Sequence, residues 1–145
     1  MIERTFALVI LHTEDERVLL QLRDDIPTIS HPNHWGLFGG RIESSESPLA
    51  AATREIVEEL SIELIERGVI RQGEFRYEPG KVHHLFSYAF RDELSTAQLN
   101  EGQRFESFAR NDMHGGNVGE LSVIPSHYRM LEAFWQSGSS TAYQR

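Results

Sequence analysis

Residues 39–60 decide the fold, and they read GGRIESSESPLAAATREIVEEL. A pair of glycines opens this stretch, and a short acidic loop joins the pair to a segment with helical periodicity. Ser47 is suited to cap a helix, and Pro48 suits the first helical position, where a missing N–H is tolerated. Apolar residues recur at i, i+3 and i+4 spacing at Leu49, Ala52, Ile56 and Leu60. The stretch therefore predicts a helix over residues 48–60.

The predicted helix carries three acids on one face. At about 100° per residue, Glu59 lies about 40° from Glu55, and Glu58 lies about 60° to the other side of Glu55. Like charges this close repel one another. Arg54 can reach Glu58, but one guanidinium does not neutralise three carboxylates together with Glu43 and Glu46 in the preceding loop. This face therefore favours a compensating cation.

The counter-charge that suits carboxylates is a hard divalent cation, and Mg²⁺ fits best. The adjacent Gly39 and Gly40, which we interpret as a turn, allow close approach of the backbone and offer a carbonyl oxygen as a further ligand. The alternative is an ordinary solvated helix face. The spacing of the acids alone leaves both interpretations open.

Hydrophobic patterning on both sides of this stretch predicts a sheet and a second helix. Strands are expected where Val, Ile, Leu and Phe concentrate or alternate with polar residues, and a polar turn at 13–16 should join the first two as a hairpin. The predicted strands are 4–12, 17–23, 69–78, 82–91 and 104–109, and the predicted second helix is 125–136. We expect one domain over 1–136, followed by a flexible tail over 137–145.

The composition restricts the classes of function. A chain of 145 residues has room for one domain of moderate size. A net charge of -8 disfavours contact with duplex nucleic acid. Cysteine is absent, which excludes disulfides, thiolate metal sites and cysteine nucleophiles. The first apolar run, residues 6–11, is too short to cross a bilayer, so we expect no membrane contact and a cytoplasmic location.

The acidic stretch resembles the signature of a known family. Gly40, five further residues, Glu46, seven further residues and the run from Arg54 to Glu59 are together similar to the Nudix box of the Nudix hydrolases. The resemblance extends from Gly40 to Ile62. Ser61 departs from it, because the family has a glycine there, at a place that often requires a left-handed backbone.

This resemblance implies a fold and a reaction. The fold would be α/β in the α+β sense, an α/β/α sandwich around a central mixed sheet. The reaction would be hydrolysis of a nucleoside diphosphate linked to another moiety, with a nucleotide sugar or a nucleoside triphosphate as the substrate. Mg²⁺ or Mn²⁺ would be required as the cofactor.

The resemblance also implies roles for individual residues. By position, the metal ligands would be the Gly39 carbonyl, Glu55, Glu58 and Glu59. Arg54 would orient the helix carboxylates, and Glu46 would support the loop before the helix. Both Arg54 and Glu55 are therefore candidate catalytic residues.

Candidates outside the helix complete the predicted site. Residues 99–103 look like a late acidic loop of the family, which would make Glu101 a metal ligand or the general base in place of Glu55. The candidate substrate-binding residues are Arg23, Gly40 and Glu43. An exposed loop acid is the alternative interpretation of Glu101, and a strand-end salt bridge is that of Arg23.

Two other functions compete with hydrolysis. A non-catalytic module that binds nucleotides as a regulator would share the fold, although the intact acids disfavour it. An isomerase is less favoured, because that branch of the family depends on residues, cysteine among them, that this chain lacks. The sequence leaves open the base, the leaving group, the phosphorus attacked and the number of metal ions. It also leaves open a homodimer, since an apolar strand edge or the last helix could form one.

Overall fold

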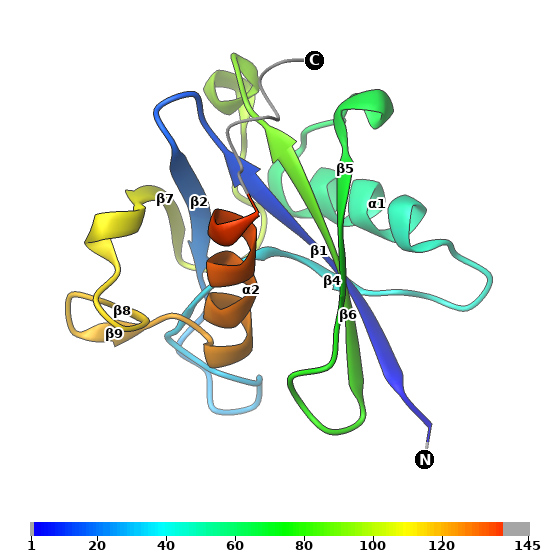
Figure 1. The fold of residues 1–145 in the computed structure, drawn as a ribbon, viewed down its shortest axis with the longest axis horizontal. Coiled ribbons are helices and arrows are strands. Elements are labelled where there is room, and N and C mark those ends of the chain that lie inside the picture. The colour runs from blue at the N-terminus through cyan, green and yellow to red at the C-terminus, as the bar shows by residue number, and fades with distance from the viewer. Residues whose placement is uncertain (1, 138–145) are drawn as a thin grey trace.

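The fold is a mixed sheet between two helices, as the computed structural model of residues 2–137 shows (Figure 1). The strands are β1 (Arg4–His12), β2 (Arg17–Leu22), β3 (Trp35–Gly36), β4 (Phe38–Arg41), β5 (Ile70–Phe75), β6 (Lys81–Ala89), β7 (Arg104–Ala109), β8 (Asn117–Val118) and β9 (Leu121–Ser122). The helices are α1 (Pro48–Leu60) and α2 (Pro125–Gln136), with short 3₁₀ turns η1 (Glu66–Gly68), η2 (Glu93–Thr96) and η3 (Arg110–Asp112). Apart from Ser137, the predicted tail over 137–145 lies outside the described residues.

The main sheet runs in the order β3-β2-β1-β6-β5, with β4 beside β1 and β7 beside β2. β1 and β2 pair antiparallel around the turn at 13–16, which confirms the predicted hairpin. β1 and β6 pair in parallel along the whole of both strands. The sheet is therefore mixed, and β1 lies at its centre.

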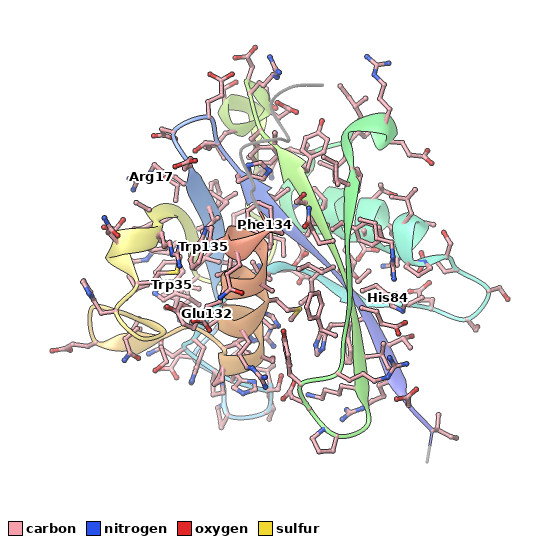
Figure 2. All side chains as sticks on the ribbon, viewed as in Figure 1. Arg17, Trp35, His84, Glu132, Phe134 and Trp135 are labelled. Atoms are coloured by element: carbon pink, nitrogen blue, oxygen red, sulfur yellow. The ribbon has the colours of Figure 1, made fainter. Side chains whose placement is uncertain are left out.

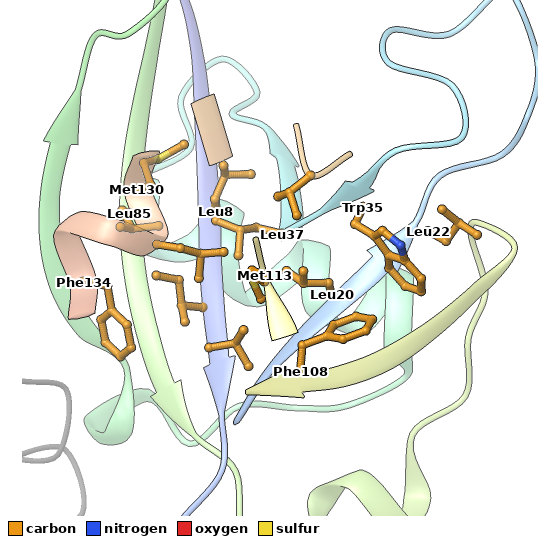
Figure 3. Close-up of a cluster of buried hydrophobic side chains, with 14 residues drawn as sticks. Leu8, Leu20, Leu22, Trp35, Leu37, Leu85, Phe108, Met113, Met130 and Phe134 are labelled. Carbon is orange, nitrogen blue, oxygen red and sulfur yellow. The ribbon is translucent and has the colours of Figure 1, made fainter. Parts of the chain in front are cut away.

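Alternate side chains of β1 enter two separate cores. Leu8 and Ile10 pack in a cluster that includes Met130 and Phe134 of α2 (Figure 3). Val9 packs on the opposite face, in a cluster that includes residues of α1. Because neighbouring residues of a strand point to opposite faces, α1 and α2 must cover opposite sides of the sheet. The predicted α/β/α sandwich is confirmed.

Polar and aromatic contacts join the outer elements to this sandwich. Arg17, at the start of β2, donates from Nη2 to the carbonyl of Ser107 in β7 at 2.9 Å. The guanidinium carbon of Arg110 in η3 lies 5.2 Å from the ring centre of Trp135, near the end of α2 (Figure 2). Within residues 2–137, no helix is both long and apolar enough to traverse a bilayer.

The predicted turn at Gly39 and Gly40 is wrong, because both residues lie in strand β4, paired antiparallel with β1. Gly39 has a φ of +136°, and a Cβ there would overlap the carbonyl oxygen of Ala7. A Cβ on Gly40 would lie 2.5 Å from Oε1 of Glu55. These glycines therefore permit close packing against β1 and α1.

Helix α1 begins and ends as its sequence indicates. Oγ of Ser47 accepts a hydrogen bond from the N–H of Ala50 at 3.1 Å, and Pro48 occupies the first turn. Ser61 adopts the left-handed conformation, with φ 58° and ψ 34°. For a residue other than glycine this conformation costs on the order of 1 kcal/mol. The serine therefore keeps the backbone path that a glycine would take freely.

Candidate active site

Arg54 is the centre of a hydrogen-bond network on the acidic face of α1. Its Nε and Nη2 donate to the two oxygens of Glu46 at 2.7 and 3.0 Å. Its Nη1 donates to Oε1 of Glu55 at 3.0 Å and to Oε1 of Glu58 at 3.1 Å. Nη2 also donates to the carbonyl of Arg41 at 3.1 Å. One guanidinium thus joins the loop after β4 to two acids of the helix.

The loop acids of this network differ in their contacts. The hydrogen bonds from Arg54 hold the pKa of Glu46 below its usual value, so Glu46 is an anion at neutral pH. Glu46 also accepts from the N–H of Glu43 at 3.0 Å, which closes the loop on itself. The carboxylate of Glu43 itself lies 3.9 Å from Nη1 of Arg54 and is largely exposed.

Glu59 is the buried acid of the site. Only 3% of its surface is exposed, and its Oε1 accepts a hydrogen bond from the N–H of Gly39 at 2.7 Å. Burial raises the pKa of Glu59 to about 9, and the bond from Gly39 offsets part of this effect. Glu55 and Glu101 raise the pKa of Glu59 further, because their charges are close. Glu59 therefore connects α1 to β4 at the point where like charges concentrate.

Glu55 and Glu101 act electrostatically on Glu59 from different elements. Burial is the main cause that raises the pKa of Glu55, with added repulsion from Glu58 and Glu101. Glu101 lies in the loop between η2 and β7, and its carbonyl accepts from Nε2 of Gln21 at 2.8 Å. The structure thus brings the late-loop acid to the helix acids, although they are over 40 residues apart in sequence.

The donor set suits a hard cation, but the carboxylates hold other partners. Carboxylate and carbonyl oxygens are the ligands that Mg²⁺ and Mn²⁺ prefer. Across residues 2–137, no three or more His, Asp or Glu side chains converge on a common point as a metal site requires. The carboxylates already hold hydrogen-bond partners, since Arg54 binds Glu55 and Glu58 while the N–H of Gly39 binds Glu59. A cation would have to replace some of these bonds.

A cavity of about 170 Å³ adjoins Gly39 and Gly40 on the side of α2. Arg23, at the end of β2, lines this cavity, and its Nε donates to the carbonyl of Ser30 at 2.9 Å. The partner that the structure gives Arg23 is therefore a carbonyl rather than the carboxylate of a salt bridge. Arg23 also borders a second hollow, together with Glu101. Of the predicted substrate-binding residues, Arg23 and Gly40 line the cavity, whereas Glu43 lies by the helix acids in a separate hollow.

The sequence did not identify three polar residues that line this cavity. Nδ1 of His83 and Oγ of Ser126 are buried without a hydrogen-bond partner in the described structure. Nδ1 of His127 accepts from the N–H of Leu37 at 3.0 Å, and burial lowers its pKa to about 3. Alternation along 82–91 predicts only that His83 and His84 point to opposite faces. No local pattern shows that α2 and β6 border one cavity.

Comparison with known proteins identifies the family. The NUDIX domain model matches residues 1–128 of this chain. A protein of Bacillus subtilis (strain 168), described as "Putative 8-oxo-dGTP diphosphatase", is 43% identical over 53 residues, or 37% of this chain. The aligned part spans only 32% of the length of that relative.

Solved structures share the fold over most of the chain. A mutT/nudix family protein from Listeria innocua has a TM-score of 0.77 at 19% identity, over 100% of this chain and 99% of that one. A bifunctional NMN adenylyltransferase/ADP ribose pyrophosphatase from Francisella tularensis, complexed with AMP and Mn ion, has a TM-score of 0.69 at 18% identity. That match covers 93% of this chain and 42% of the other. The fold and the family model agree, and the chain belongs to the NUDIX domain family.

Proposed function

We propose that this protein is a pyrophosphohydrolase that uses Mg²⁺ or Mn²⁺ to cleave a nucleoside diphosphate linked to another moiety. The observation that carries the proposal is the buried Glu59, held on the N–H of Gly39 beside Glu55 and Glu101. Burying an acid among like charges is unfavourable, so its retention at this place suggests a role with a cation. Its proposed unit is the single domain over 1–136, with the cytoplasm as its compartment.

The proposed metal ligands are the carbonyl of Gly39 and four acids, Glu55, Glu58, Glu59 and Glu101. When bound, the cation would supply neutralisation of the diphosphate charge and Lewis-acid activation of water. Arg54 contributes by holding Glu55 and Glu58 on the same side of α1 through Nη1. Glu46 in turn holds Arg54 through two oxygens, a geometry that fixes the guanidinium plane.

The remaining steps belong to groups of this chain. A carboxylate must accept the proton of the attacking water, and Glu55 and Glu101 are the two candidates because the charges of both act on Glu59. Arg23 can contact a phosphate from the rim of the cavity, where a guanidinium offers paired N–H donors. The cavity beside Gly39 and Gly40 is placed to receive the organic part of the substrate.

The relatives support two substrate classes. The Bacillus subtilis relative is described as a "Putative 8-oxo-dGTP diphosphatase", which favours a nucleoside triphosphate. The Francisella tularensis neighbour is an ADP ribose pyrophosphatase with AMP and Mn ion, which favours a nucleotide sugar and a divalent cation. Both classes contain the same bond, a phosphoric anhydride next to a nucleoside. We therefore propose the anhydride as the common feature of the substrate.

Phosphorus NMR tests this proposal. The protein is incubated with a panel of nucleoside triphosphates and nucleotide sugars in the presence of Mg²⁺. The proposal predicts a nucleoside monophosphate with pyrophosphate from a triphosphate, or with a sugar phosphate from a nucleotide sugar. Tight binding without turnover across the panel would contradict it and favour a regulatory nucleotide-binding module.

A further inference from the structure

The loop that carries Glu101 is hydrogen-bonded to the end of α1 through Asn100. The backbone N–H of Asn100 donates to the carbonyl of Glu59 at 2.9 Å. Its side-chain Nδ2 donates to the carbonyl of Glu58 at 3.0 Å and to Oγ of Ser61 at 2.9 Å. Asn100 therefore contacts the backbone of two residues whose side chains belong to the proposed site.

These carbonyls are available because they lie at the end of the helix. The last four carbonyls of an α-helix have no partner within it and need donors from elsewhere. The N–H of Gln98 supplies another, since it donates to the carbonyl of Leu60 at 2.9 Å. Ser61 presents its Oγ to Asn100 from the left-handed position at which a glycine would offer no side chain. The departure from the family signature thus adds a contact to the late loop.

The other side of the loop is attached to the end of β2. Gln21 donates to the carbonyl of Glu101, and the N–H of Gln103 donates to the carbonyl of Leu22, each at 2.8 Å. Gly102 has a φ of +85°, and a Cβ there would lie 2.8 Å from the carbonyl of Leu22. Glu101 is therefore held between an attachment to α1 and an attachment to β2.

We propose that Asn100 is a positioning residue, which sets the carboxylate of Glu101 against the acids of α1. The inference rests on the proposed function, because it concerns how Glu101 meets Glu55 and Glu59. Asn100 touches the backbone that carries Glu58 and Glu59 and is the immediate neighbour of Glu101. Loss of its side chain removes the bonds to the carbonyl of Glu58 and to Oγ of Ser61, so that, within residues 2–137, only backbone hydrogen bonds hold the loop to α1. A role limited to filling space would depend on the shape of the side chain and not on its N–H donors.

The test uses the full chain and compares two substitutions with one matched control. Asn100→Ala removes the side chain, whereas Asn100→Asp keeps its shape but cannot donate to the carbonyl of Glu58. Asn111→Ala, at an exposed position in η3, is the control for the same change of residue type. Thermal melts come first, and every variant is assayed well below its own melting temperature. The readouts are kcat, KM and the affinity for Mn²⁺ alone, measured by titration calorimetry.

We expect both Asn100 variants to lose about tenfold or more in kcat and in Mn²⁺ affinity. A loss of this size is typical when a residue that holds metal ligands in place is replaced. KM should change less than twofold, because the cavity beside Gly39 is lined by other residues. The control should match the wild type. The inference would be overturned if Asn100→Ala had the kcat and Mn²⁺ affinity of the wild type. Wild-type values in Asn100→Asp would also overturn it, because that side chain cannot donate to the carbonyl of Glu58.

The two proposals fail in different ways. If the wild type turns over no anhydride of the panel, the proposed function is wrong, and the Mn²⁺ titrations of the variants still decide the inference. If the wild type is active and the Asn100 variants match it, only the inference is wrong.

Discussion

Glu59 is the residue whose surroundings differ most from those of an ordinary surface glutamate. It is almost fully buried, and its oxygen is bound by the N–H of Gly39 at 2.7 Å. Two further acids, Glu55 and Glu101, add repulsion. A site of this kind lowers stability in the absence of a cation, so its presence is better explained by function than by packing.

Glu58 is the acid of the site that can be replaced with the least effect on the stability of the fold. Its side chain is 49% exposed and is bonded to Arg54, so the fold does not depend on its burial. We expect Glu58→Gln to lower kcat by about 100-fold or more, because the neutral amide is a poor ligand for a hard cation. Steady-state kinetics at saturating substrate and ordinary Mg²⁺ concentration check this result.

Glu63→Gln makes the same substitution at an exposed residue beyond the helix and serves as the control. It should keep the wild-type kcat. Wild-type turnover in Glu58→Gln would remove Glu58 from the proposed metal ligands, whatever the control shows.

Arg54 connects helix α1 to the loop that precedes it. The guanidinium holds Glu46 through two parallel bonds while it reaches both Glu55 and Glu58. Lysine keeps the charge but lacks the planar fork, so it cannot form these bonds together. We expect Arg54→Lys to lower kcat by about tenfold to 100-fold.

The matched control for Arg54→Lys is Arg76→Lys. Arg76 also pairs with two acids, Glu74 and Glu3, but it does so at an exposed position between β5 and β6. This change should leave kcat within twofold of the wild type. Equal losses in both variants would show that the effect of Arg54→Lys does not come from the orientation of the helix acids.

Elements with a strong local pattern were predicted within a few residues. The bounds of α1, α2, β1 and β7 agree with the predicted ranges, because a 3.6-residue stripe or an apolar run specifies them locally. β2 ends one residue before the predicted range, and β5 is shorter than residues 69–78.

The elements that the sequence did not predict depend on distant partners. β4 resembles a turn because it contains two glycines, and it becomes a strand only by pairing with β1. The parallel pairing of β1 with β6 joins residues far apart in the chain, which no local pattern encodes. The same limit applies to the site. The spacing of the helix acids predicted their common face, but not that Arg54 and the N–H of Gly39 would occupy their oxygens.

The two faces of the sheet have different roles in the whole molecule. α1 contributes the acids on one face, whereas α2 on the other contributes part of the cavity beside Gly39 and Gly40. At the wall of that cavity, His127 accepts from the N–H of Leu37 and is therefore neutral at that nitrogen. Protonation of this nitrogen would remove the acceptor for the N–H of Leu37, so the free energy of unfolding depends on pH.

We expect His127 to make the protein less stable in mild acid. Burial lowers its pKa to about 3 in the folded state, while the unfolded value stays at 6.5. The unfolded chain then binds the extra proton first, so the free energy of unfolding falls as the pH drops below 6.5. This group should account for a loss of about 2 kcal/mol between pH 7 and pH 5.

Urea unfolding of metal-free protein at both pH values measures this loss. His127→Asn keeps an acceptor for the N–H of Leu37 but does not titrate, so the fall in stability should be smaller by that amount. His114→Asn, at an exposed histidine, is the matched control and should keep the wild-type pH dependence. An unchanged pH dependence in His127→Asn would contradict the assignment of this loss to His127.

We infer that the acids of α1 and the loop of Glu101 hold a hard cation for hydrolysis. Titration calorimetry of the wild-type protein with Mn²⁺, with and without a nucleoside monophosphate, tests it most directly. We expect saturable binding of Mn²⁺ that weakens at least tenfold in Glu58→Gln. If the wild-type protein bound no Mn²⁺ under either condition, these acids would not form a cation site.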